Sequence, residues 1–322
     1  MKILHLFSSK VFAGLERHVE ELSYEQSKSH QVVVIGPERF KDKFRANYTT
    51  INTNQWRYSP LLWLELRDAM ARINPDIVHT HGQKMTNIIK ADLHFSTIHG
   101  TKKNVAAFKK SQFIFGASKK SLEKIPQQKS MVLENWVDES RFNNYEQKDP
   151  EYFLYIGRFE PVKNPERLIR AWKSEYGKLL MVGSGQLEKD LIVLIKQLGL
   201  DNTIELHSET DDVGSLLNKA HALIISSDRE GSPKVLYESL YCKVPVLSTD
   251  CGNIAEVLPN QSIAETNDQS FQHLLKKWAG KINELSLLQK NCFNEVRSKN
   301  LLSIQTKKVN EKYQEFLSMA SR

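Results

Sequence analysis

The run Ala222-Leu223-Ile224-Ile225 leads into Glu230-Gly231-Ser232-Pro233-Lys234-Val235-Leu236-Tyr237-Glu238, and this stretch decides the fold of the 322-residue chain. The first part is short and apolar, which is typical of a buried strand. The second part contains a serine followed by a proline, and helices often begin in this way because serine caps well and proline suits the first helical position. We therefore predict a strand, a loop and a helix, with Ser232 as the N-cap and Pro233 as the first helical residue.

Two glutamates bracket this predicted loop and helix. Glu230 stands at the mouth of the helix, and Glu238 lies about two turns further on, at roughly 3.6 residues per turn. The start of a helix offers unpaired backbone N–H groups to an anion, and carboxylates beside it accept hydrogen bonds from hydroxyls. A pocket that holds both a phosphate and a polyol indicates a sugar nucleotide.

Short apolar runs alternate with amphipathic stretches along the rest of the chain. Predicted strands cover residues 3–7, 31–35, 77–80, 95–98, 113–117, 131–133, 152–156, 179–182, 204–206, 222–225 and 244–248. Predicted helices cover residues 15–28, 61–73, 85–90, 119–124, 165–173, 186–198, 212–219, 233–241 and much of the chain from 270 onward. This alternation predicts an α/β fold with parallel sheets covered on both faces.

The strand series restarts at Tyr152, after a polar segment at 140–150 that has the composition of a linker. We predict two doubly wound, Rossmann-like domains that face each other across a cleft. Their expected bounds are residues 1–147 and 148–302, with a terminal amphipathic helix within 303–322.

The positive charge is concentrated in the first of these domains. Residues 1–147 carry 22 Lys and Arg against 15 Asp and Glu, whereas the remaining residues carry 23 of each. Eight lysines and one acid lie within residues 102–129. A basic face attracts an anionic glycan, an anionic membrane surface or nucleic acid, although a plain solvated surface would have the same composition. No nucleic-acid motif accompanies it, so nucleic acid is not an expected partner.

Targeting and redox features favour the cytoplasm. The apolar start of the chain is too short for a signal peptide, and no run approaches the roughly 20 apolar residues of a membrane span. Cys242, Cys251 and Cys292 have neither metal-binding nor redox spacing, which fits a reducing compartment.

A second anion-binding element follows the predicted strand 152–156. Arg158 and Lys163 bracket its loop, and Asn164-Pro165 begins the next helix. Two cations and a helix N-terminus on one loop would hold a diphosphate by charge-assisted hydrogen bonds. Gly183-Ser184-Gly185 forms another strand-to-helix turn, but the third glycine of a dinucleotide fingerprint is missing, which disfavours a nicotinamide dehydrogenase.

Further motifs occur in order along about residues 10–260: Ala13-Gly14-Leu15-Glu16, Pro75-Asp76-Ile77-Val78-His79-Thr80-His81, Thr97-Ile98-His99-Gly100, Asn135-Trp136-Val137-Asp138, Tyr155-Ile156-Gly157-Arg158, Lys163-Asn164, Gly183-Ser184-Gly185 and Val244-Pro245-Val246-Leu247-Ser248-Thr249-Asp250-Cys251-Gly252. Together with the two spaced glutamates, they resemble the retaining GT-B glycosyltransferases of family 4.

The resemblance implies a role for each candidate residue. Arg158 and Lys163 would bind the donor phosphates and, without metal, offset charge on the departing nucleotide. Glu238 would hold the ribose hydroxyls, and Glu230 and His99 would contact the transferred sugar. The remaining expected donor-site residues contribute mainly backbone: Gly14, Gly183, Gly185, Gly231, Ser232, Pro233, Lys234 and Val235. The last helix would cross back to the first domain.

The chain departs from the family pattern at three positions. Trp136 replaces a glycine, Ser232 stands where an aromatic residue is usual, and Ala13 replaces the first of two glycines. His79 and His81 form an H-x-H pair that could suggest a metal, but no third ligand is apparent in the sequence. We therefore expect neither a metal site nor a cofactor.

An aromatic segment precedes and enters the predicted helix 61–73. It reads Gln55-Trp56-Arg57-Tyr58-Ser59-Pro60-Leu61-Leu62-Trp63-Leu64. The segment could dock on a membrane or shape an acceptor groove. The helical spacing instead favours burial of Leu61, Leu62, Leu64 and Leu66.

The sequence thus predicts a cytoplasmic retaining glycosyltransferase that uses a nucleotide-diphosphate sugar, expected to be a UDP-sugar. A glycan or lipid-linked acceptor, an anionic one in view of the charge, would belong to bacterial cell-envelope polysaccharide or lipopolysaccharide synthesis. Association with the inner face of the plasma membrane through residues 102–129 is left open. Two alternatives remain, a sugar-nucleotide epimerase of the same fold and a non-catalytic nucleotide-sugar-binding protein.

Overall fold

The computed structural model describes residues 1–142 and 149–320. The chain forms two compact units, one made of Met1–Asn135 with the C-terminal segment from Leu302 onward, the other of Trp136–Leu301. The units divide at Asn135, earlier than the predicted boundary at 147. Much of the predicted linker, residues 143–148, lies outside the described residues.

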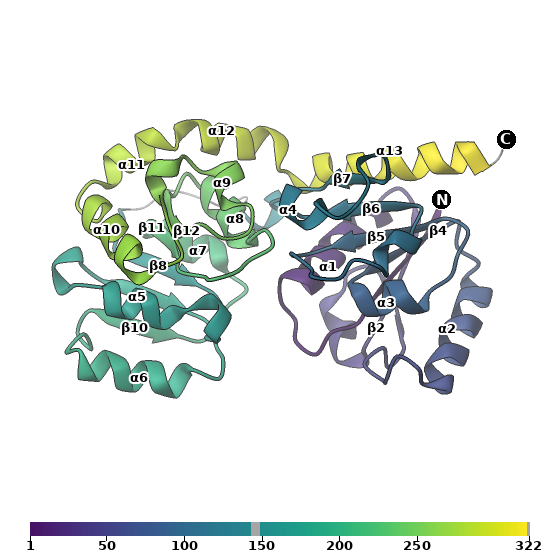
Figure 1. Ribbon diagram of the computed structural model, residues 1–322, viewed down its shortest axis with the longest axis horizontal. Helices are drawn as coiled ribbons and strands as arrows, with labels where there is room; N and C mark the ends of the chain where they lie inside the picture. The colour runs from purple at the N-terminus through teal and green to yellow at the C-terminus, as the bar shows by residue number, and fades with distance from the viewer. Residues whose placement is uncertain (143–148, 321–322) are drawn as a thin grey trace. The chain divides into compact units, whose positions relative to one another are not determined.

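The first unit is built on a seven-stranded parallel sheet in the order β3-β2-β1-β4-β5-β6-β7 (Figure 1). Its strands are β1 Lys2–Phe7, β2 Gln31–Gly36, β3 Asn47–Thr50, β4 Ile77–His81, β5 His94–Ile98, β6 Phe113–Gly116 and β7 Ser130–Val132. Its α-helices are α1 Gly14–Ser27, α2 Pro60–Ile73, α3 Gln83–Ile88, α4 Lys119–Leu122 and α13 Leu302–Ala320.

The second unit repeats this plan with a six-stranded parallel sheet in the order β10-β9-β8-β11-β12-β13. Its strands are β8 Tyr152–Ile156, β9 Leu179–Val182, β10 Ile204–His207, β11 Ala220–Ile225, β12 Val246–Thr249 and β13 Ile263–Ala264. Its α-helices are α5 Pro165–Ala171, α6 Glu188–Gln197, α7 Val213–Asn218, α8 Lys234–Tyr241, α9 Ile254–Val257, α10 Asp268–Trp278, α11 Ile282–Leu288 and α12 Lys290–Lys299.

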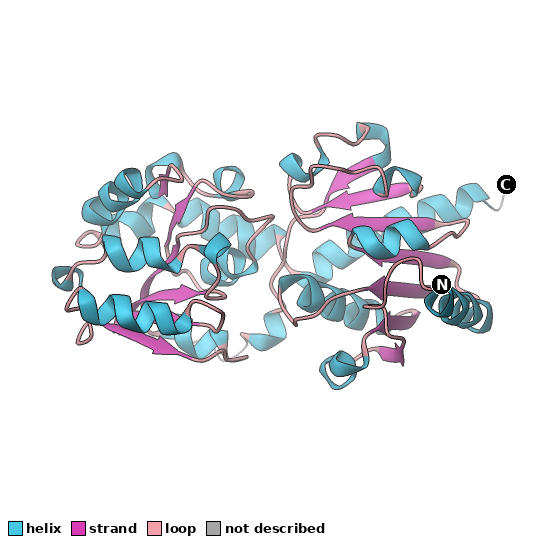
Figure 2. Ribbon diagram, turned by 60° about the horizontal axis from the view of Figure 1, so that its bottom comes forward, coloured by secondary structure: helices cyan, strands magenta, loops and turns pink. Residues whose placement is uncertain are grey.

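Helices cover both faces of the second sheet, as Figure 2 illustrates. Consecutive strand residues point to opposite faces, so Phe153 packs in one apolar core and Leu154 in the other. Leu168 of α5 joins the first core, and Leu236 of α8 joins the second. Because apolar cores pack against both faces of this sheet, the loops at the ends of its strands are attached to a well-packed element.

The two faces of the first sheet differ in polarity. One face carries Leu4 and Leu6 of β1 in an apolar core with Leu62 of α2 and Met85 of α3. The other face carries three buried polar side chains: His5 of β1, and His79 and His81 of the neighbouring strand β4. Buried polar groups require hydrogen-bond partners, so these histidines need a dedicated network.

Helix α13 packs within the first unit although it closes the chain. Its Tyr313 and Phe316 contact Phe95 of β5, and Phe316 also contacts Phe113 of β6. Tyr313 is fully buried. Helix α13 therefore covers the face of the sheet on which Phe95, Phe113 and His79 lie.

In each sheet the strand order reverses once, and each reversal marks a crevice where ligands bind in folds of this type. The reversal lies between β1 and β4 in the first unit and between β8 and β11 in the second. The candidate residue Gly14 begins α1 directly after the loop that follows β1, and Arg158 and Lys163 lie in the segment that follows β8. Glu230 lies on the loop that follows β11.

Most predicted elements are confirmed, and two kinds of expectation are wrong. Helix α8 begins at Lys234 with Pro233 as its N-cap, because Pro233 has an extended ψ of 122°, so Ser232 is not the N-cap. In helix α2, Leu62 and Leu66 are buried as expected, but Leu61 and Leu64 are 57% and 47% exposed. None of the helices within the described residues is long and apolar enough to cross a membrane.

Candidate functional site

An ion pair between Lys163 and Glu230 lies at the carboxyl end of the second sheet. The Lys163 Nζ is 2.5 Å from Glu230 Oε1, and the two side chains are 22% and 11% exposed. The Ser227 hydroxyl donates to the same Glu230 oxygen at 2.7 Å. The structure thus brings together a predicted phosphate-binding cation and a predicted sugar-binding carboxylate, and the loop after β11 fixes the carboxylate.

Arg158 lies on the loop after β8 and has a different partner. Its guanidinium donates to Glu160 at 2.6 Å, and the pair is about one-third exposed. Burial raises the pKa of the nearby Tyr155 hydroxyl, while Glu230 adds to this increase and Arg158 opposes it. Arg158 and Glu230 therefore both act on the Tyr155 hydroxyl, which places them in one electrostatic environment.

The loop between β11 and α8 is tied to the loops on either side of it. The Ser226 hydroxyl donates to the Lys163 carbonyl oxygen at 3.1 Å, and the Thr249 hydroxyl donates to the Ser227 carbonyl oxygen at 2.6 Å. Gly252 has a φ of 63°, and a Cβ there would lie 2.6 Å from the Gly231 carbonyl oxygen. The backbone that presents Glu230 is therefore held on both sides.

Arg167 of α5 is a supporting residue that sequence analysis missed. This buried side chain contacts Asp228 at 2.8 Å and Asp268 at 2.9 Å, and it donates to the Ser226 carbonyl oxygen at 3.1 Å. Arg167 thereby links α5 to the loop that carries Glu230. Its setting in an ordinary amphipathic helix gave no sequence signal of this role.

The glycine turn after β9 packs against the protein's own backbone. A Cβ at Gly183 would lie 2.0 Å from the Gly157 carbonyl oxygen, and one at Gly185 would lie 2.5 Å from the Phe159 carbonyl oxygen. Gly185 also has a φ of 155°. These glycines allow the turn to lie against the loop that carries Arg158.

Glu238 lies in the second turn of α8 and is 5% exposed. Its carboxylate is 3.5 Å from the Arg141 guanidinium, which also donates to the Asp211 carbonyl oxygen at 2.9 Å. Arg141 falls in the segment predicted as a linker, so the sequence gave no sign of this contact. The predicted ribose-binding carboxylate is thus buried beside a cation.

Trp136 and Lys234 contact each other at the start of α8. The Lys234 ammonium donates to the Trp136 carbonyl oxygen at 3.0 Å, and Trp136 is fully buried. Among the described residues, the non-glycine positions with positive φ are Asn74, Asn164 and Lys243, so Trp136 lacks the strain that a glycine conformation would impose. The departure from the family pattern is accommodated by packing.

In the first unit, Gly14 opens helix α1 directly after the loop that follows β1. A Cβ at Gly14 would meet nothing within 4 Å. The Glu16 carboxylate accepts a hydrogen bond from the Ala13 backbone N–H at 2.7 Å, which caps the helix start. Unlike Gly183, Gly14 is not required by contacts within the described chain, so its surroundings leave room for a ligand.

His99 follows β5 and is partly buried beside other histidines. Its Nε2 lies 3.2 Å from His81 Nδ1, and its ring meets that of His18 edge-on at a centroid distance of 4.6 Å. Burial and the nearby Lys102 lower the pKa of His99 to about 3. At neutral pH His99 is therefore uncharged, and it can accept or donate a hydrogen bond.

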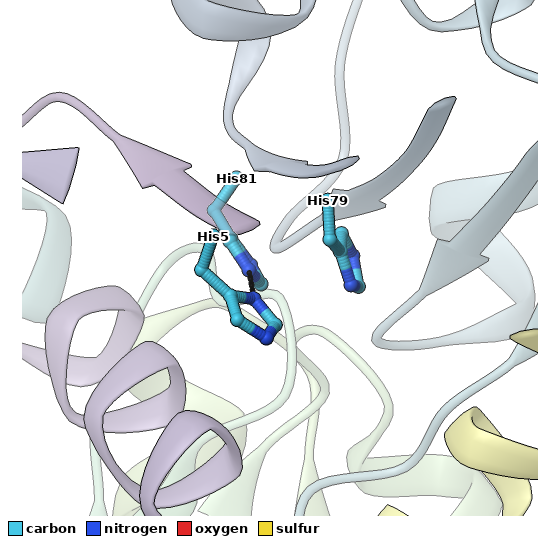
Figure 3. A group of neighbouring side chains, drawn as sticks. All are labelled: His5, His79 and His81. Carbon is cyan, nitrogen blue, oxygen red and sulfur yellow. Dashed lines mark hydrogen bonds between the residues drawn. The ribbon is translucent and has the colours of Figure 1, made fainter. Parts of the chain in front are cut away.

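His79 and His81 have a third histidine beside them, contrary to the expectation from sequence. His5 lies on the neighbouring strand β1 in register with His79, so the three rings gather on one face of the sheet (Figure 3). A second group joins His18, His81 and His99. Metal ligands require ring nitrogens with available lone pairs, and the ring nitrogens of the first group already have hydrogen-bond partners.

The two units thus offer different chemistry at equivalent places in their sheets. The second unit presents Lys163 and Arg158 near carboxylates and a helix start, which suits a phosphate together with hydroxyls. The first unit presents the neutral His99 next to His18 and His81, and neutral imidazoles suit hydrogen bonds with hydroxyl groups.

Two protein-family models match this chain, and together they cover most of it. The model described as Glycosyltransferase Family 4 matches residues 12–141, and the model described as Glycosyl transferases group 1 matches residues 137–289. The boundary between the two matches lies close to the division of the structure into two units.

Curated relatives align over part of the chain. An α-1,4-N-acetyl-D-galactosaminyltransferase of Campylobacter jejuni, named for a PP-undecaprenol-linked glycan, is 32% identical over 38% of this chain and 35% of its own length. An O-antigen chain mannosyltransferase of Salmonella typhimurium is 27% identical over 51% of this chain and 46% of its own. The chain spans about a third to a half of the length of the curated relatives that it matches.

Solved structures align over nearly the whole chain. HepE of Anabaena in complex with UDP has a TM-score of 0.83 at 14% identity, covering 98% of this chain and 100% of its own. A glycosyltransferase of Rickettsia africae has a TM-score of 0.81 at 21% identity, covering 98% of each chain. At these identities the likeness concerns the fold.

Proposed function

Because the chain belongs to family 4 of the GT-B glycosyltransferases, we propose that it is a retaining enzyme that moves a sugar from a UDP-sugar to a hydroxyl of a glycan or lipid-linked acceptor. The observation that carries this proposal is the Lys163–Glu230 pair at the crevice of the second sheet, with Glu238 buried in the second turn of α8. UDP as the nucleotide is supported by the Anabaena structure, which was solved with UDP.

In the proposed reaction, the bond between the anomeric carbon and the diphosphate oxygen breaks, and its electron pair leaves with UDP. The acceptor oxygen then bonds to the same face of the anomeric carbon, and its proton passes to the departing diphosphate oxygen. Lys163 and Arg158 stabilise the negative charge that develops on the departing diphosphate, so no metal ion is required. Fixed cations are effective in this role because they need little reorganisation as the charge develops.

The carboxylates bind hydroxyl groups. Glu238 accepts hydrogen bonds from the ribose, and Glu230 accepts from the transferred sugar. Each carboxylate has a cation as its resting partner, Arg141 for Glu238 and Lys163 for Glu230. A bound donor must therefore share Lys163 with Glu230, which would couple the phosphate contact to the sugar contact.

We assign the acceptor to the first unit, and an anionic acceptor fits its charge. All eight lysines between residues 102 and 129 are exposed, so their positive charge faces solvent. The names of the relatives from Campylobacter and Salmonella support a bacterial cell-envelope glycan or lipopolysaccharide as the product class.

We further propose that the protein works in the cytoplasm at the inner face of the plasma membrane. Besides the lysines, an aromatic group on and before α2 is exposed: Trp56 is 71%, Tyr58 55% and Trp63 43% exposed. Exposed aromatic rings and Lys side chains are the groups that insert into and bind an anionic bilayer surface. These two surfaces can be tested separately.

The transfer reaction is tested by incubating the protein with a panel of UDP- and GDP-sugars, EDTA and lipid-linked glycans from a bacterial membrane extract. The account predicts one α-linked product from an α-configured UDP-sugar, assigned by NMR of the anomeric proton. A β-linked product would contradict retention, and loss of activity in EDTA that Mg²⁺ restores would contradict metal independence. Isomerisation of the donor alone would identify an epimerase.

Membrane binding is tested by cosedimentation with vesicles of phosphatidylglycerol and phosphatidylethanolamine. Replacing four lysines of the first unit by serine (102, 103, 109 and 110) should weaken binding by about 1 kcal/mol for each lysine. The matched control replaces four exposed lysines of the second unit (276, 277, 281 and 290) and should bind like the wild type. Trp56→Ser separates the aromatic contribution. Equal losses in both lysine variants would contradict a specific surface.

A further inference from the structure

Three histidines of the first unit form a continuous chain of hydrogen bonds that ends at His99. His5 Nδ1 lies 3.0 Å from His81 Nε2, and His81 Nδ1 lies 3.2 Å from His99 Nε2. The contact between His5 and His81 is drawn in Figure 3. At its other end, His5 Nε2 lies 2.7 Å from the side-chain oxygen of Gln26 on α1.

Gln26 gives this chain a direction. Its amide nitrogen donates to Asn310 Oδ1 of α13 at 2.8 Å, so the amide oxygen faces His5. A carbonyl oxygen only accepts, and the Nε2 of His5 must therefore carry the hydrogen.

A neutral imidazole has one N–H group and one lone pair, so each ring passes the direction to the next. His5 Nδ1 accepts from the N–H of His81 Nε2, and His81 Nδ1 accepts from the N–H of His99 Nε2. This sequence leaves His99 with its lone pair on Nδ1. The alternative tautomer of any one ring would place two hydrogens or two lone pairs against each other.

The three rings are uncharged at neutral pH. Burial lowers the pKa of His5 to about 4, and it holds the pKa of His81 well below its usual value. A charged ring would carry two N–H groups and would break the direction of the chain.

We propose that Gln26, His5 and His81 are positioning residues that fix His99 as the Nε2–H tautomer, so that His99 Nδ1 accepts a hydrogen bond from a substrate hydroxyl. Asn310 on α13 anchors the relay, which extends from the last helix of the chain to the candidate site. This assignment rests on the proposed function for the identity of the hydroxyl, but the tautomer itself does not depend on it.

A metal site made of the same rings is the competing arrangement. The ligand atoms of His5, His79 and His81 lie within 4.8 Å of one another. However, His79 Nε2 bonds with Thr97 Oγ1 at 2.7 Å, and its Nδ1 bonds with the Tyr313 hydroxyl. A metal would take one nitrogen from each ring and would therefore displace one hydrogen bond of each, so the observed network favours the relay.

The test is a long-range ¹H–¹⁵N spectrum of the full chain with ¹⁵N-labelled histidine at pH 7.5, with His99 identified by the signals lost in His99→Gln. The relay predicts a protonated-type Nε2 and an unprotonated-type Nδ1 for His99. In His81→Phe and Gln26→Leu this preference should weaken, and Gln26→Glu should keep it because a carboxylate oxygen still accepts from His5. An Nδ1–H tautomer in the wild type would overturn the proposal.

Activity provides a second readout. His81→Phe and Gln26→Leu should lower kcat/KM by up to about tenfold, because the relay acts only through the hydrogen bond that His99 makes, and Gln26→Glu should recover most of this loss. His94→Gln, which removes another buried histidine outside the relay, is the matched control and should keep both tautomer and activity. A tautomer as predicted in a protein without transferase activity would refute only the proposed function. Zn²⁺ that shifts the His5, His79 and His81 signals at one equivalent would establish the metal site and overturn the relay.

Discussion

The second unit places charged pairs on the loops at the crevice of its sheet, whereas the first unit places neutral imidazoles on and next to the central strands of its own sheet. Lys163 with Glu230 and Arg158 with Glu160 are the pairs of the second unit. His5, His81 and His99 form the chain of the first. The two sheets reverse strand order at equivalent points, so the fold does not explain this difference.

The difference shows how one fold can supply two kinds of recognition. Paired charges hold an anion strongly and stabilise charge that appears during a reaction. Neutral rings bind hydroxyl groups and set their orientation, but they contribute little to a diphosphate. The account therefore assigns charge stabilisation to the second unit and hydroxyl placement to the first.

The largest predicted effect that distinguishes the units is acid unfolding of the first unit. His5, His79, His81, His94 and His99 have lowered pKa values because they are buried. Unfolded, they bind protons near pH 6.5, so stability is fully present above that pH and falls as the pH drops below it. For each histidine, the free energy of unfolding falls by at most about 1.4 kcal/mol per pH unit in that range, compared with about 5–15 kcal/mol for a whole domain.

Urea denaturation at pH 8 and pH 5, with hydrogen exchange and peptide mass spectrometry, assigns the loss to one unit. Between pH 8 and pH 5, the free energy of unfolding of residues 1–135 should fall by several kcal/mol. That of residues 136–301 should fall far less, because His221 is the one histidine among the described residues of that unit with a lowered pKa. An equal loss in both units would show that the buried histidines do not set the acid limit.

The next effect concerns catalysis by the charged pair. Lys163→Ala should lower kcat about 10²- to 10³-fold, because a fixed cation stabilises the departing diphosphate. His99→Ala should lower kcat/KM only about tenfold, since a neutral hydrogen bond contributes roughly 0.5–1.5 kcal/mol. Steady-state kinetics with the donor sugar varied provide both values. A larger loss for His99→Ala would reverse the assignment of roles.

Two glycine turns provide a smaller contrast, in stability. Gly183→Ala should destabilise the second unit by about 1–3 kcal/mol or more, because the new Cβ would lie 2.0 Å from a backbone oxygen that cannot easily move. Gly14→Ala should leave the urea midpoint unchanged but weaken substrate binding, since its surroundings are open. If Gly14→Ala also kept full activity, the loop after β1 would not approach a substrate.

The smallest effect concerns Arg158 and its exposed partner. Glu160→Gln removes a charge that competes for the guanidinium, so the KM for the donor should fall about twofold. Stability should change by less than about 1 kcal/mol, because exposed ion pairs contribute little. Donor titrations and urea midpoints measure both, and an increased KM would indicate that Glu160 orients Arg158 instead of competing for it.

The regular part of the fold could be predicted because buried parallel strands are apolar runs between helices. Strand β3, Asn47-Tyr48-Thr49-Thr50, was missed because this edge strand has no apolar run, and β13 has only two residues. The start of α8 was placed one residue early because Ser232 and Pro233 also fit a cap and a first turn. The extended ψ of Pro233 makes it the N-cap, and the local sequence does not predict this angle.

The candidate site was predicted only as far as its motifs reach. Lys163 and Glu230 meet because their loops follow adjacent strands, which the strand order could suggest. Arg141 and Arg167 make contacts with residues far away in the sequence, so no motif or residue spacing predicted these contacts. His5 did leave a signal, a histidine inside the otherwise apolar run of β1, and its register with His79 completes the cluster.

The central claim, that the second unit holds the nucleotide-sugar donor, is tested most directly by calorimetric titration with UDP in EDTA. The wild type should bind UDP without metal. Lys163→Ala and Glu238→Ala should each lose at least tenfold in affinity, and His99→Ala should bind UDP like the wild type. Unchanged binding by Lys163→Ala and Glu238→Ala, or no binding by the folded wild type, would contradict the account.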